Sequence, residues 1–285
     1  MRLYAFPDPR GCGQAVLAAA SLRGHTAASD GVKADAAFVR TVNYGDERGS
    51  CLDTLRWFGN ADIPCVPAPA ASDWYDNKLA QFDLLRDWLP PTIVAHTADA
   101  AIIPWAYPFV SKSAFGSGSA NVRLIRSVSD ARAEIKGAFG PGIPAKGGVQ
   151  RGYLYWQALI PANTRDVRVV VAGRRLYGLI RQCRDDLPFA SGSGRTMPVT
   201  DLSDPQVLAA FMLADEIAER IDAPWSCYDF VFDSDRAYCL EVSTSWKEAS
   251  YDTCPVFDRA SLVPTGETGE AWAEFAVDAL EAMLS

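Results

Sequence analysis

Residues 225–243 read WSCYDFVFDSDRAYCLEVS. Their aromatic and β-branched side chains predict two strands, 225–232 and 236–242, which a tight turn joins. An antiparallel pair of this kind places Asp229 beside Glu241 on one face. Two carboxylates among apolar neighbours repel each other unless a cation lies between them, and their oxygens suit Mg²⁺. In the alternative interpretation, Asp229 lies at a strand edge and Glu241 forms a structural salt bridge.

A lysine followed by glycines forms a second motif, YPFVSKSAFGSGS over residues 107–119. Lys112 ends a predicted strand, and Gly116, Ser117 and Gly118 lie in the loop after it. Glycines let backbone N–H groups approach a polyphosphate, and the lysine places a positive charge beside it. The motif therefore predicts a phosphate-binding loop, although a hairpin loop beside an exposed lysine is equally consistent with these residues.

Arginines follow the middle strands of the C-terminal half. Arg168 and Arg181 fall on adjacent predicted strands, 166–171 and 174–181, so their planar guanidinium groups can share one anionic ligand. Arg174 and Arg175 follow Gly173 at a predicted hairpin turn, where we expect a surface role.

Hydrophobic periodicity divides the chain into three predicted domains, 1–72, 73–155 and 156–285. In the first, helices near 14–23 and 52–58 alternate with strands at 36–41 and 63–66, which predicts a small parallel sheet. The second begins with a helix from Asp76, whose predicted buried face consists of Leu79, Phe82, Leu85 and Trp88. It continues with strands at 92–95, 107–111 and 122–125 and a helix at 129–138.

The third domain follows a Gly- and Pro-rich segment, 139–152, which predicts a mobile connection. Long strands rich in β-branched and aromatic residues are predicted at 153–160, 166–171, 174–181, 225–232 and 236–242. Amphipathic helices are predicted at 205–221 and 267–284.

In their order and spacing these elements resemble the ATP-grasp superfamily, especially the branch with the ribosomal-protein glutamate ligase and glutathione synthetase. The resemblance covers about residues 76–245. Asp76-Asn-Lys78 is similar to the family's DxK start, and Lys112 with its loop is similar to the central-domain lysine and phosphate-covering loop. Asp166-Val-Arg168 matches the D-[IV]-R strand, with Arg181 one strand later. The strand 155–161 resembles the family's hinge strand, whose backbone meets the adenine. Asp229 together with Glu241-Val-Ser243 resembles the family's D…E-x-N pair of metal-binding strands.

This resemblance implies an α/β (α+β) ATP-grasp fold: an N-terminal α/β domain, a central β-rich lid subdomain and a C-terminal antiparallel-sheet lobe. It implies ATP and Mg²⁺ as cofactors and Arg168 and Arg181 as the catalytic residues that stabilise the transferring phosphoryl group. The implied nucleotide contacts are Lys78, Lys112, Gly116, Ser117, Gly118, Gln157, Ala158, Leu159 and Ile160. The implied metal ligands are Asp229, Glu241 and Ser243. Ser243 stands where most members have asparagine, so a second metal is expected to be held more loosely or through water.

The implied activity is an ATP-dependent carboxylate–amine (or thiol) ligase that forms an acyl phosphate and joins it to a nucleophile. Two alternatives remain open from the sequence: an ATP-grasp phosphotransferase that acts on a small-molecule hydroxyl, and a non-catalytic ATP-binding protein. The acceptor is expected to be a small molecule or a peptide. Homo-oligomers are common among the related enzymes.

The composition is that of a folded globular protein, with 49% hydrophobic, 22% charged and 11% aromatic residues among 285. The net charge of −8 and the scattered basic residues make nucleic acid an improbable partner. No apolar run approaches the roughly 20 residues of a membrane span, and the N-terminus lacks a signal-peptide core, so no membrane association and a cytoplasmic location are expected. The seven cysteines show no CxxC pair, which predicts reduced thiols.

Overall fold

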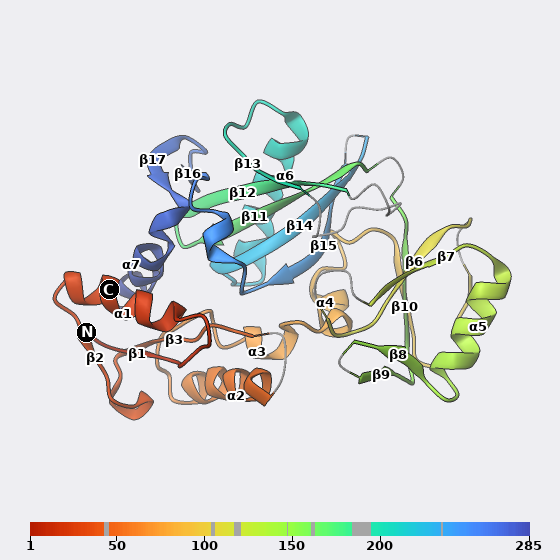
Figure 1. The fold of residues 1–285 in the computed structure, drawn as a ribbon, viewed down its shortest axis with the longest axis horizontal. Coiled ribbons are helices and arrows are strands. Elements are labelled where there is room, and N and C mark those ends of the chain that lie inside the picture. Colours follow the sequence, from red (N-terminus) through yellow and green to blue (C-terminus); the bar gives the residue numbers. More distant parts are fainter. Residues whose placement is uncertain are drawn as a thin grey trace.

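The computed structural model describes residues 1–42, 46–103, 106–116, 121–146, 148–160, 163–183, 195–234 and 236–285. The three larger of four sheets organise these residues into an N-terminal lobe (β1 to α3), a central lobe (β5 to β10) and a C-terminal lobe (β11 to α7). Figure 1 shows the N-terminal and central lobes on opposite sides of the C-terminal sheet, and the two chain ends close together.

A four-stranded parallel sheet in the order β2-β1-β3-β4 forms the N-terminal lobe, which confirms the predicted small parallel sheet. Its elements are β1 (Arg2–Ala5), α1 (Cys12–Leu22), β2 (Thr26–Ala27), a 3₁₀ turn (Gly31–Lys33), β3 (Ala36–Phe38), α2 (Asp46–Asn60), β4 (Cys65–Val66) and α3 (Ala71–Trp74). The prediction missed β1, although β1 lies inside the sheet. Only Leu3 of its four residues is fully buried, so the strand carries no hydrophobic period.

The central lobe is an antiparallel sheet in the order β5-β10-β6-β7. Its strands are β5 (Thr92–Ala95), β6 (Phe109–Lys112), β7 (Val122–Ile125) and β10 (Leu154–Ala158), and α5 (Val128–Ala138) packs on them through Ala131 and Ala138. The predicted boundary between residues 155 and 156 falls inside β10. The predicted mobile connection is wrong in part, because β8 (Ile143–Ala145) and β9 (Gly148–Gln150) form a hairpin there. Gly142, at φ 95°, supplies a turn before this hairpin rather than a flexible linker.

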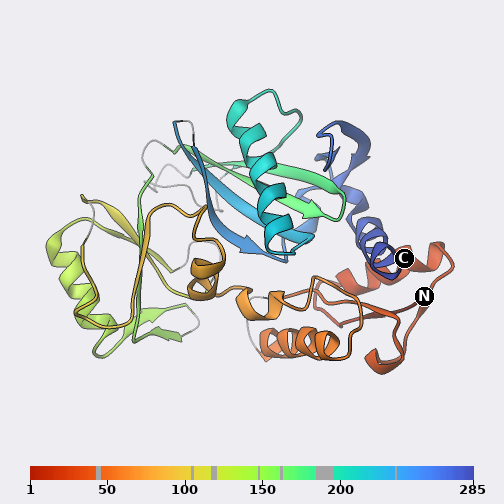
Figure 2. The same ribbon diagram turned by 180° about the vertical axis from the view of Figure 1, so that it is seen from behind.

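An antiparallel sheet in the order β15-β14-β11-β12-β16-β17, with β13 beside β12, forms the C-terminal lobe. Its elements are β11 (Arg165–Ala172), β12 (Arg175–Gln182), β13 (Thr196–Pro198), α6 (Pro205–Arg220), β14 (Trp225–Asp233), β15 (Arg236–Ser243), a 3₁₀ turn (Glu248–Ser250), β16 (Pro255–Asp258), β17 (Pro264–Thr268), a second 3₁₀ turn (Gly269–Ala271) and α7 (Trp272–Leu284). Figure 2 shows α6 across one face of this sheet. The last helix begins later than predicted. The backbone at Gly269 lies very close to the Tyr251 carbonyl, because a Cβ on Gly269 would be 2.3 Å from that oxygen. This position therefore needs glycine.

Two hydrophobic clusters each join the N-terminal and C-terminal lobes. One connects Leu55 and Phe58 of α2 to Phe211 of α6, and the other connects Val16 of α1 to Phe275 of α7. A third cluster, which contains Phe109 and Trp156, belongs to the central lobe alone. Trp156 and Trp225 are buried core residues, and all seven cysteines are free thiols, as predicted for the cysteines.

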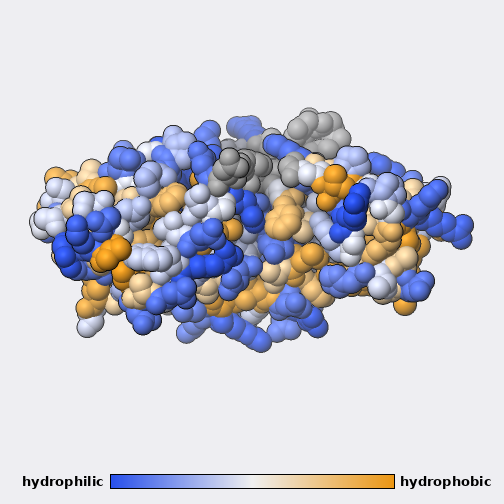
Figure 3. Space-filling view, turned by 90° about the horizontal axis from the view of Figure 1, so that it is seen from below, coloured by the Kyte–Doolittle hydropathy of each residue, from blue (hydrophilic) through white to orange (hydrophobic). Residues whose placement is uncertain are grey.

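No helix among the described residues is both long enough and apolar enough to cross a membrane. On the face shown in Figure 3, strongly hydrophobic side chains occur singly among hydrophilic ones.

Candidate active site

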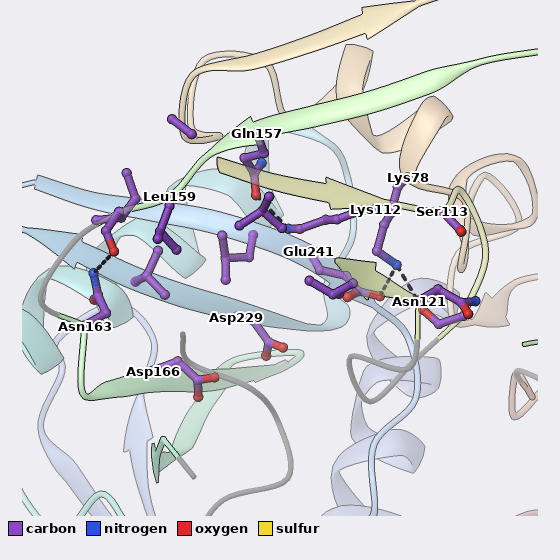
Figure 4. Close-up of a pocket in the computed structure, with 17 residues that line it drawn as sticks. Lys78, Lys112, Ser113, Asn121, Gln157, Leu159, Asn163, Asp166, Asp229 and Glu241 are labelled. Carbon is purple, nitrogen blue, oxygen red and sulfur yellow. Dashed lines mark hydrogen bonds and ion pairs between the residues drawn. The ribbon is translucent and has the colours of Figure 1, made fainter. Parts of the chain in front are cut away.

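A pocket opens between the central sheet and the C-terminal sheet, and its lining combines charged and apolar side chains. The charged residues are Lys78, Lys112, Asp166, Asp229 and Glu241, and the apolar ones are Val110, Val122, Ala158, Leu159, Ile160, Val231 and Leu240. Ser113, Gly116, Asn121, Gln157 and Asn163 complete the lining (Figure 4). A pocket that is partly apolar with a few convergent charges is the usual form of a small-molecule site.

Strand geometry explains why these side chains converge. Val110 and Lys112 are two residues apart on β6, as are Asp229 and Val231 on β14, so each pair projects from one face. β14 and β15 pair with Asp229 opposite Glu241, and a bulge follows between Asp229 and Phe230. The prediction that these two carboxylates lie side by side is confirmed.

Helix α4 (Lys78–Leu84) brings Lys78 to Glu241, as Figure 4 shows. The Lys78 Nζ lies 3.0 Å from the Gly116 carbonyl oxygen and 3.4 Å from Glu241 Oε1. Gln81, one turn later, fixes the helix on β15: its Nε2 donates to the Val242 carbonyl at 2.9 Å, and its Oε1 accepts from the Val242 N–H at 3.3 Å. Leu85 and Trp88 are buried as predicted, whereas Leu79 and Phe82 are half-buried. Lys78 and Gln81, which were not predicted to be buried, are also buried.

The start of the glycine loop is held from two sides. Asp76 Oδ1 accepts a hydrogen bond from the Gly116 N–H at 3.0 Å, while Lys78 binds the Gly116 carbonyl. Gly116 has φ 116°, and a Cβ there would lie 2.6 Å from Asn121 Nδ2. Asn121 donates in turn to the Phe115 carbonyl at 2.9 Å. The predicted ligands Ser117 and Gly118 lie outside the described residues.

Lys112 is 8% exposed, and its Nζ donates to Gln157 Oε1 at 2.6 Å. The Gln157 amide is itself held, because its Nε2 donates to Thr92 Oγ1 at 2.9 Å. Burial, reinforced by the positive charge of Lys78, lowers the pKa of Lys112 to about 8. The lysine therefore keeps its proton at neutral pH but holds it less firmly than a surface lysine.

The predicted hinge lies where the chain leaves the central sheet. The Ala158 N–H donates to the Pro91 carbonyl at 2.8 Å, and Leu159 and Ile160 then line the pocket. Asn163 joins this segment to β14: its Oδ1 accepts from the Phe232 N–H at 2.8 Å, and its Nδ2 donates to the Phe232 carbonyl at 2.8 Å and to the Ile160 carbonyl at 3.2 Å. The apolar part of the pocket therefore has a backbone wall that the side chain of Asn163 fixes.

Arg168 and Arg181 share one anion, as predicted, but that anion is the carboxylate of Asp229. Arg168 binds it with two parallel hydrogen bonds of 2.5 and 2.7 Å, and Arg181 adds a contact of 2.8 Å. Burial alone would raise the pKa of Asp229, but the two guanidinium groups offset it and hold that pKa below its ordinary value. Neither arginine is among the lining residues of the pocket.

Ser243, the third predicted metal ligand, lies opposite Cys227 on β14. Its Oγ donates to the Ser245 carbonyl at 3.0 Å and accepts from the Ser245 N–H at 3.2 Å, and it is not among the lining residues. Within the described parts of the chain, no group of three His, Cys, Asp or Glu side chains forms a metal site. The pair Asp229 and Glu241 fits Mg²⁺, which commonly takes one or two carboxylates together with phosphate oxygens.

The sequence analysis did not single out several lining residues. Val110 and Val231 were detectable, because each lies two positions from a predicted ligand on the same strand. Asn121 and Asn163 gave no signal, since each acts through hydrogen bonds to backbone distant in sequence.

Neither a protein-family model nor a curated protein sequence matches the chain. Solved structures do match over nearly its whole length. A RimK domain ATP-grasp protein from Sphaerobacter thermophilus DSM 20745 superposes with a TM-score of 0.63 at 20% identity, covering 99% of this chain and 100% of that chain. The ATP-grasp ligase PsnB, complexed with a phosphomimetic variant of a minimal precursor, Mg and ADP, gives 0.60 at 16%, with 99% and 98% covered. D-alanine–D-alanine ligase from Bacillus anthracis gives 0.53 at 11%, with 99% and 96% covered.

The architecture is therefore that of the ATP-grasp superfamily, as the sequence resemblance predicted. At these identities the likeness shows the fold alone.

Proposed function

We propose that this chain is an ATP-dependent ligase of the ATP-grasp type, which activates a carboxylate with Mg-ATP as an acyl phosphate and joins it to an amine or another nucleophile. One observation carries the proposal: two buried lysines, Lys78 and Lys112, and two carboxylates, Asp229 and Glu241, meet in one pocket beside an apolar slot. The solved structures with this fold include the ATP-grasp ligase PsnB complexed with Mg and ADP and a D-alanine–D-alanine ligase, which supports ligation.

Each part of the pocket has a place in this proposal. The slot formed by Val110, Leu159, Ile160, Val231 and Leu240 suits a purine ring. The two lysines suit the phosphates, because their charges neutralise negative charge that spreads over a transferring phosphoryl group. Asp229 and Glu241 would hold Mg²⁺, which when bound supplies positive charge beside the phosphate oxygens.

The acceptor is proposed to enter from the side of the N-terminal lobe. This lobe packs on the C-terminal sheet through a shared hydrophobic cluster, which fixes its position relative to that sheet and supports the proposed route. The PsnB structures contain a precursor peptide, which supports a peptide acceptor as one class to test alongside small carboxylates and amines.

Calorimetric titration with Mg-ATP tests the site. Glu241→Ala and Lys112→Ala are each expected to weaken binding by about 1–3 kcal/mol, because each removes a charged partner. Lys136→Ala and Glu219→Ala, which remove exposed charges distant from the pocket, are the matched controls and should bind like the wild type. A wild-type protein that binds no nucleotide would refute the proposal.

Product analysis tests the reaction. A ligase releases ADP and free phosphate only when carboxylate and nucleophile are both present, whereas the alternative phosphotransferase releases ADP without free phosphate. The assay screens carboxylate and amine pairs and short peptides while both products are measured.

A further inference from the structure

The two carboxylates proposed to hold the metal are not equivalent. Both oxygens of Asp229 are occupied: Oδ1 accepts from Arg168 Nε at 2.5 Å, and Oδ2 accepts from Arg168 Nη2 at 2.7 Å and lies 2.8 Å from Arg181 Nη2. Because a carboxylate offers about four acceptor positions, these contacts leave little for another partner. The Asp229 side chain is only 14% exposed.

Arg181 cannot leave Asp229 easily by moving alone. Its Nε donates to Asp166 Oδ1 at 2.5 Å, and its side chain and that of Asp166 are 4% and 3% exposed. β11 and β12 pair with Asp166 opposite Arg181, and β11 and β14 pair with Arg168 opposite Asp229. The four side chains therefore form a charge-balanced group, in which Asp166 and Arg181 are buried and Arg168 and Asp229 are half-buried, and the strand register specifies their pairing.

Glu241 differs from Asp229 in each of these respects. Its side chain is 26% exposed, and its one ion-pair partner among the described residues is Lys78, at 3.4 Å. A cation that enters the pocket can therefore reach Glu241 directly. At Asp229 it must compete with two guanidinium groups, which also repel it.

The charges around the pocket favour an anion as the first ligand. Lys78, Lys112, Arg168 and Arg181 are four cations, and Asp166, Asp229 and Glu241 are three carboxylates, which leaves one net positive charge. A phosphate group can form the same parallel hydrogen bonds with arginine that Asp229 forms. It can therefore replace the carboxylate as the partner of Arg168.

We infer that Arg168 and Arg181 act as a latch on Asp229, so that Asp229 binds a divalent cation only after an anionic group of the bound ligands has taken over these arginines. This inference rests on the proposed function, since the anionic group that displaces Asp229 from the arginines is the triphosphate of bound ATP or the acyl phosphate formed from it. It makes metal and anion binding mutually dependent, and such coupling is reciprocal.

Mn²⁺ titration followed by electron paramagnetic resonance, with Mn²⁺ as the only added ligand, tests the latch. Arg168→Gln is expected to bind Mn²⁺ at least about fivefold more tightly than the wild type, because it frees Oδ1 of Asp229 and leaves Arg181 as the one guanidinium group on that carboxylate. Arg168→Lys keeps the charge but loses the parallel pair of hydrogen bonds. It serves as a second variant if Arg168→Gln does not fold, and it should show a smaller gain in the same direction.

Arg165→Gln is the matched control, because Arg165 lies on the same strand and pairs with Asp204 outside the pocket. It should bind Mn²⁺ like the wild type. Adding Asp229→Asn to Arg168→Gln should abolish the gain, which would show that the new ligand is Asp229.

Two results would overturn the latch. One is equal affinity for Mn²⁺ in the wild type and in Arg168→Gln. The other is a gain in Mn²⁺ affinity from Arg168→Gln that remains when Asp229→Asn is added. Neither depends on nucleotide. Calorimetry with Mg-ATP separately decides the proposed function, so the two failures are distinguishable.

Discussion

Lys112 is expected to make the proposed nucleotide binding depend on pH. Its pKa of about 8 lies below the ordinary value for lysine, because burial and the charge of Lys78 disfavour the protonated form. Below about pH 8 the ammonium group is present and attracts phosphate; above it the group becomes neutral. Affinity for Mg-ATP, measured by calorimetry, is therefore expected to fall roughly tenfold or more between pH 8 and 10.

Lys112→Arg is the control for this prediction, because a guanidinium group stays charged throughout that range. Its affinity should change little with pH. A wild-type affinity that is equally flat from pH 8 to 10 would show that the charge of Lys112 does not contribute to binding.

At the scale of single residues, the sequence identified positions better than partners. Asp229 and Glu241 were predictable as neighbours because a hairpin with a short turn has few possible registers. The pairing of Arg168 with Asp229 was not, because it requires β11 to lie beside β14, and α6 and β12 separate these strands along the chain. Strand order is a property of the whole sheet, so a local pattern does not reveal it.

Among the elements, α4 depends on one polar side chain for its position. Gln81 forms two hydrogen bonds with the Val242 backbone and donates a third to the Trp74 carbonyl at 3.0 Å. Gln81→Ala would leave buried backbone groups without partners, which is expected to lower the free energy of unfolding by about 1–3 kcal/mol. Urea denaturation measures the loss, with Gln182→Ala, at an exposed position on β12, as the control.

The same substitution should also raise the KM for ATP, because Lys78 lies on the helix that Gln81 anchors. Unchanged stability and unchanged KM together would show that α4 is held by its apolar contacts alone.

The glycine loop begins at a position that needs glycine. Gly116→Ala would place a Cβ 2.6 Å from Asn121 Nδ2 at a backbone φ of 116°, so both strain and a clash are expected. A loss of about 1–3 kcal/mol in the free energy of unfolding is expected from the backbone conformation. Gly49→Ala in α2 is the opposite case, since nothing lies within 4 Å of its Cβ, and it should stabilise the protein slightly. Thermal unfolding of the two variants and the wild type measures both changes in stability. A Gly116→Ala variant as stable as the wild type would contradict the prediction.

Helices and strands with a clear hydrophobic period could be predicted from the sequence, whereas short strands that are stabilised by pairing with adjacent strands could not. The strands at 92–95 and 122–125 have the predicted bounds, and α5 and α6 differ by one residue at an end. β1, β16 and β17 were missed because each is short and gains its stability from adjacent strands. The predicted buried face of the helix from Asp76 was right for Leu85 and Trp88, but it omitted Lys78 and Gln81, whose burial depends on polar partners distant in sequence.

For the whole molecule, the hydrophobic clusters predict how it unfolds. The central lobe has its own cluster, whereas the N-terminal and C-terminal lobes share two. Native-state hydrogen exchange in low urea should show β6 and β10 opening before the rest, and β1 opening together with β14.

Two core variants sharpen this prediction. Phe109 and Phe275 are both buried, and replacing either with alanine is expected to cost about 3–5 kcal/mol. Phe109→Ala should accelerate exchange in the central lobe alone, whereas Phe275→Ala should accelerate it in β1 and β14 together. If neither substitution changes the rate of hydrogen exchange in β1, the N-terminal lobe unfolds independently of the other two lobes.

The packing of α1 against α7 also has a consequence for synthesis on the ribosome. Figure 1 shows these two helices side by side, and Val16 of α1 and Phe275 of α7 belong to one hydrophobic cluster. All of residues 23–271 must be translated between them. The side of α1 that contacts α7 therefore stays uncovered until α7 is made, so the nascent chain exposes it to chaperones while residues 23–271 are synthesised.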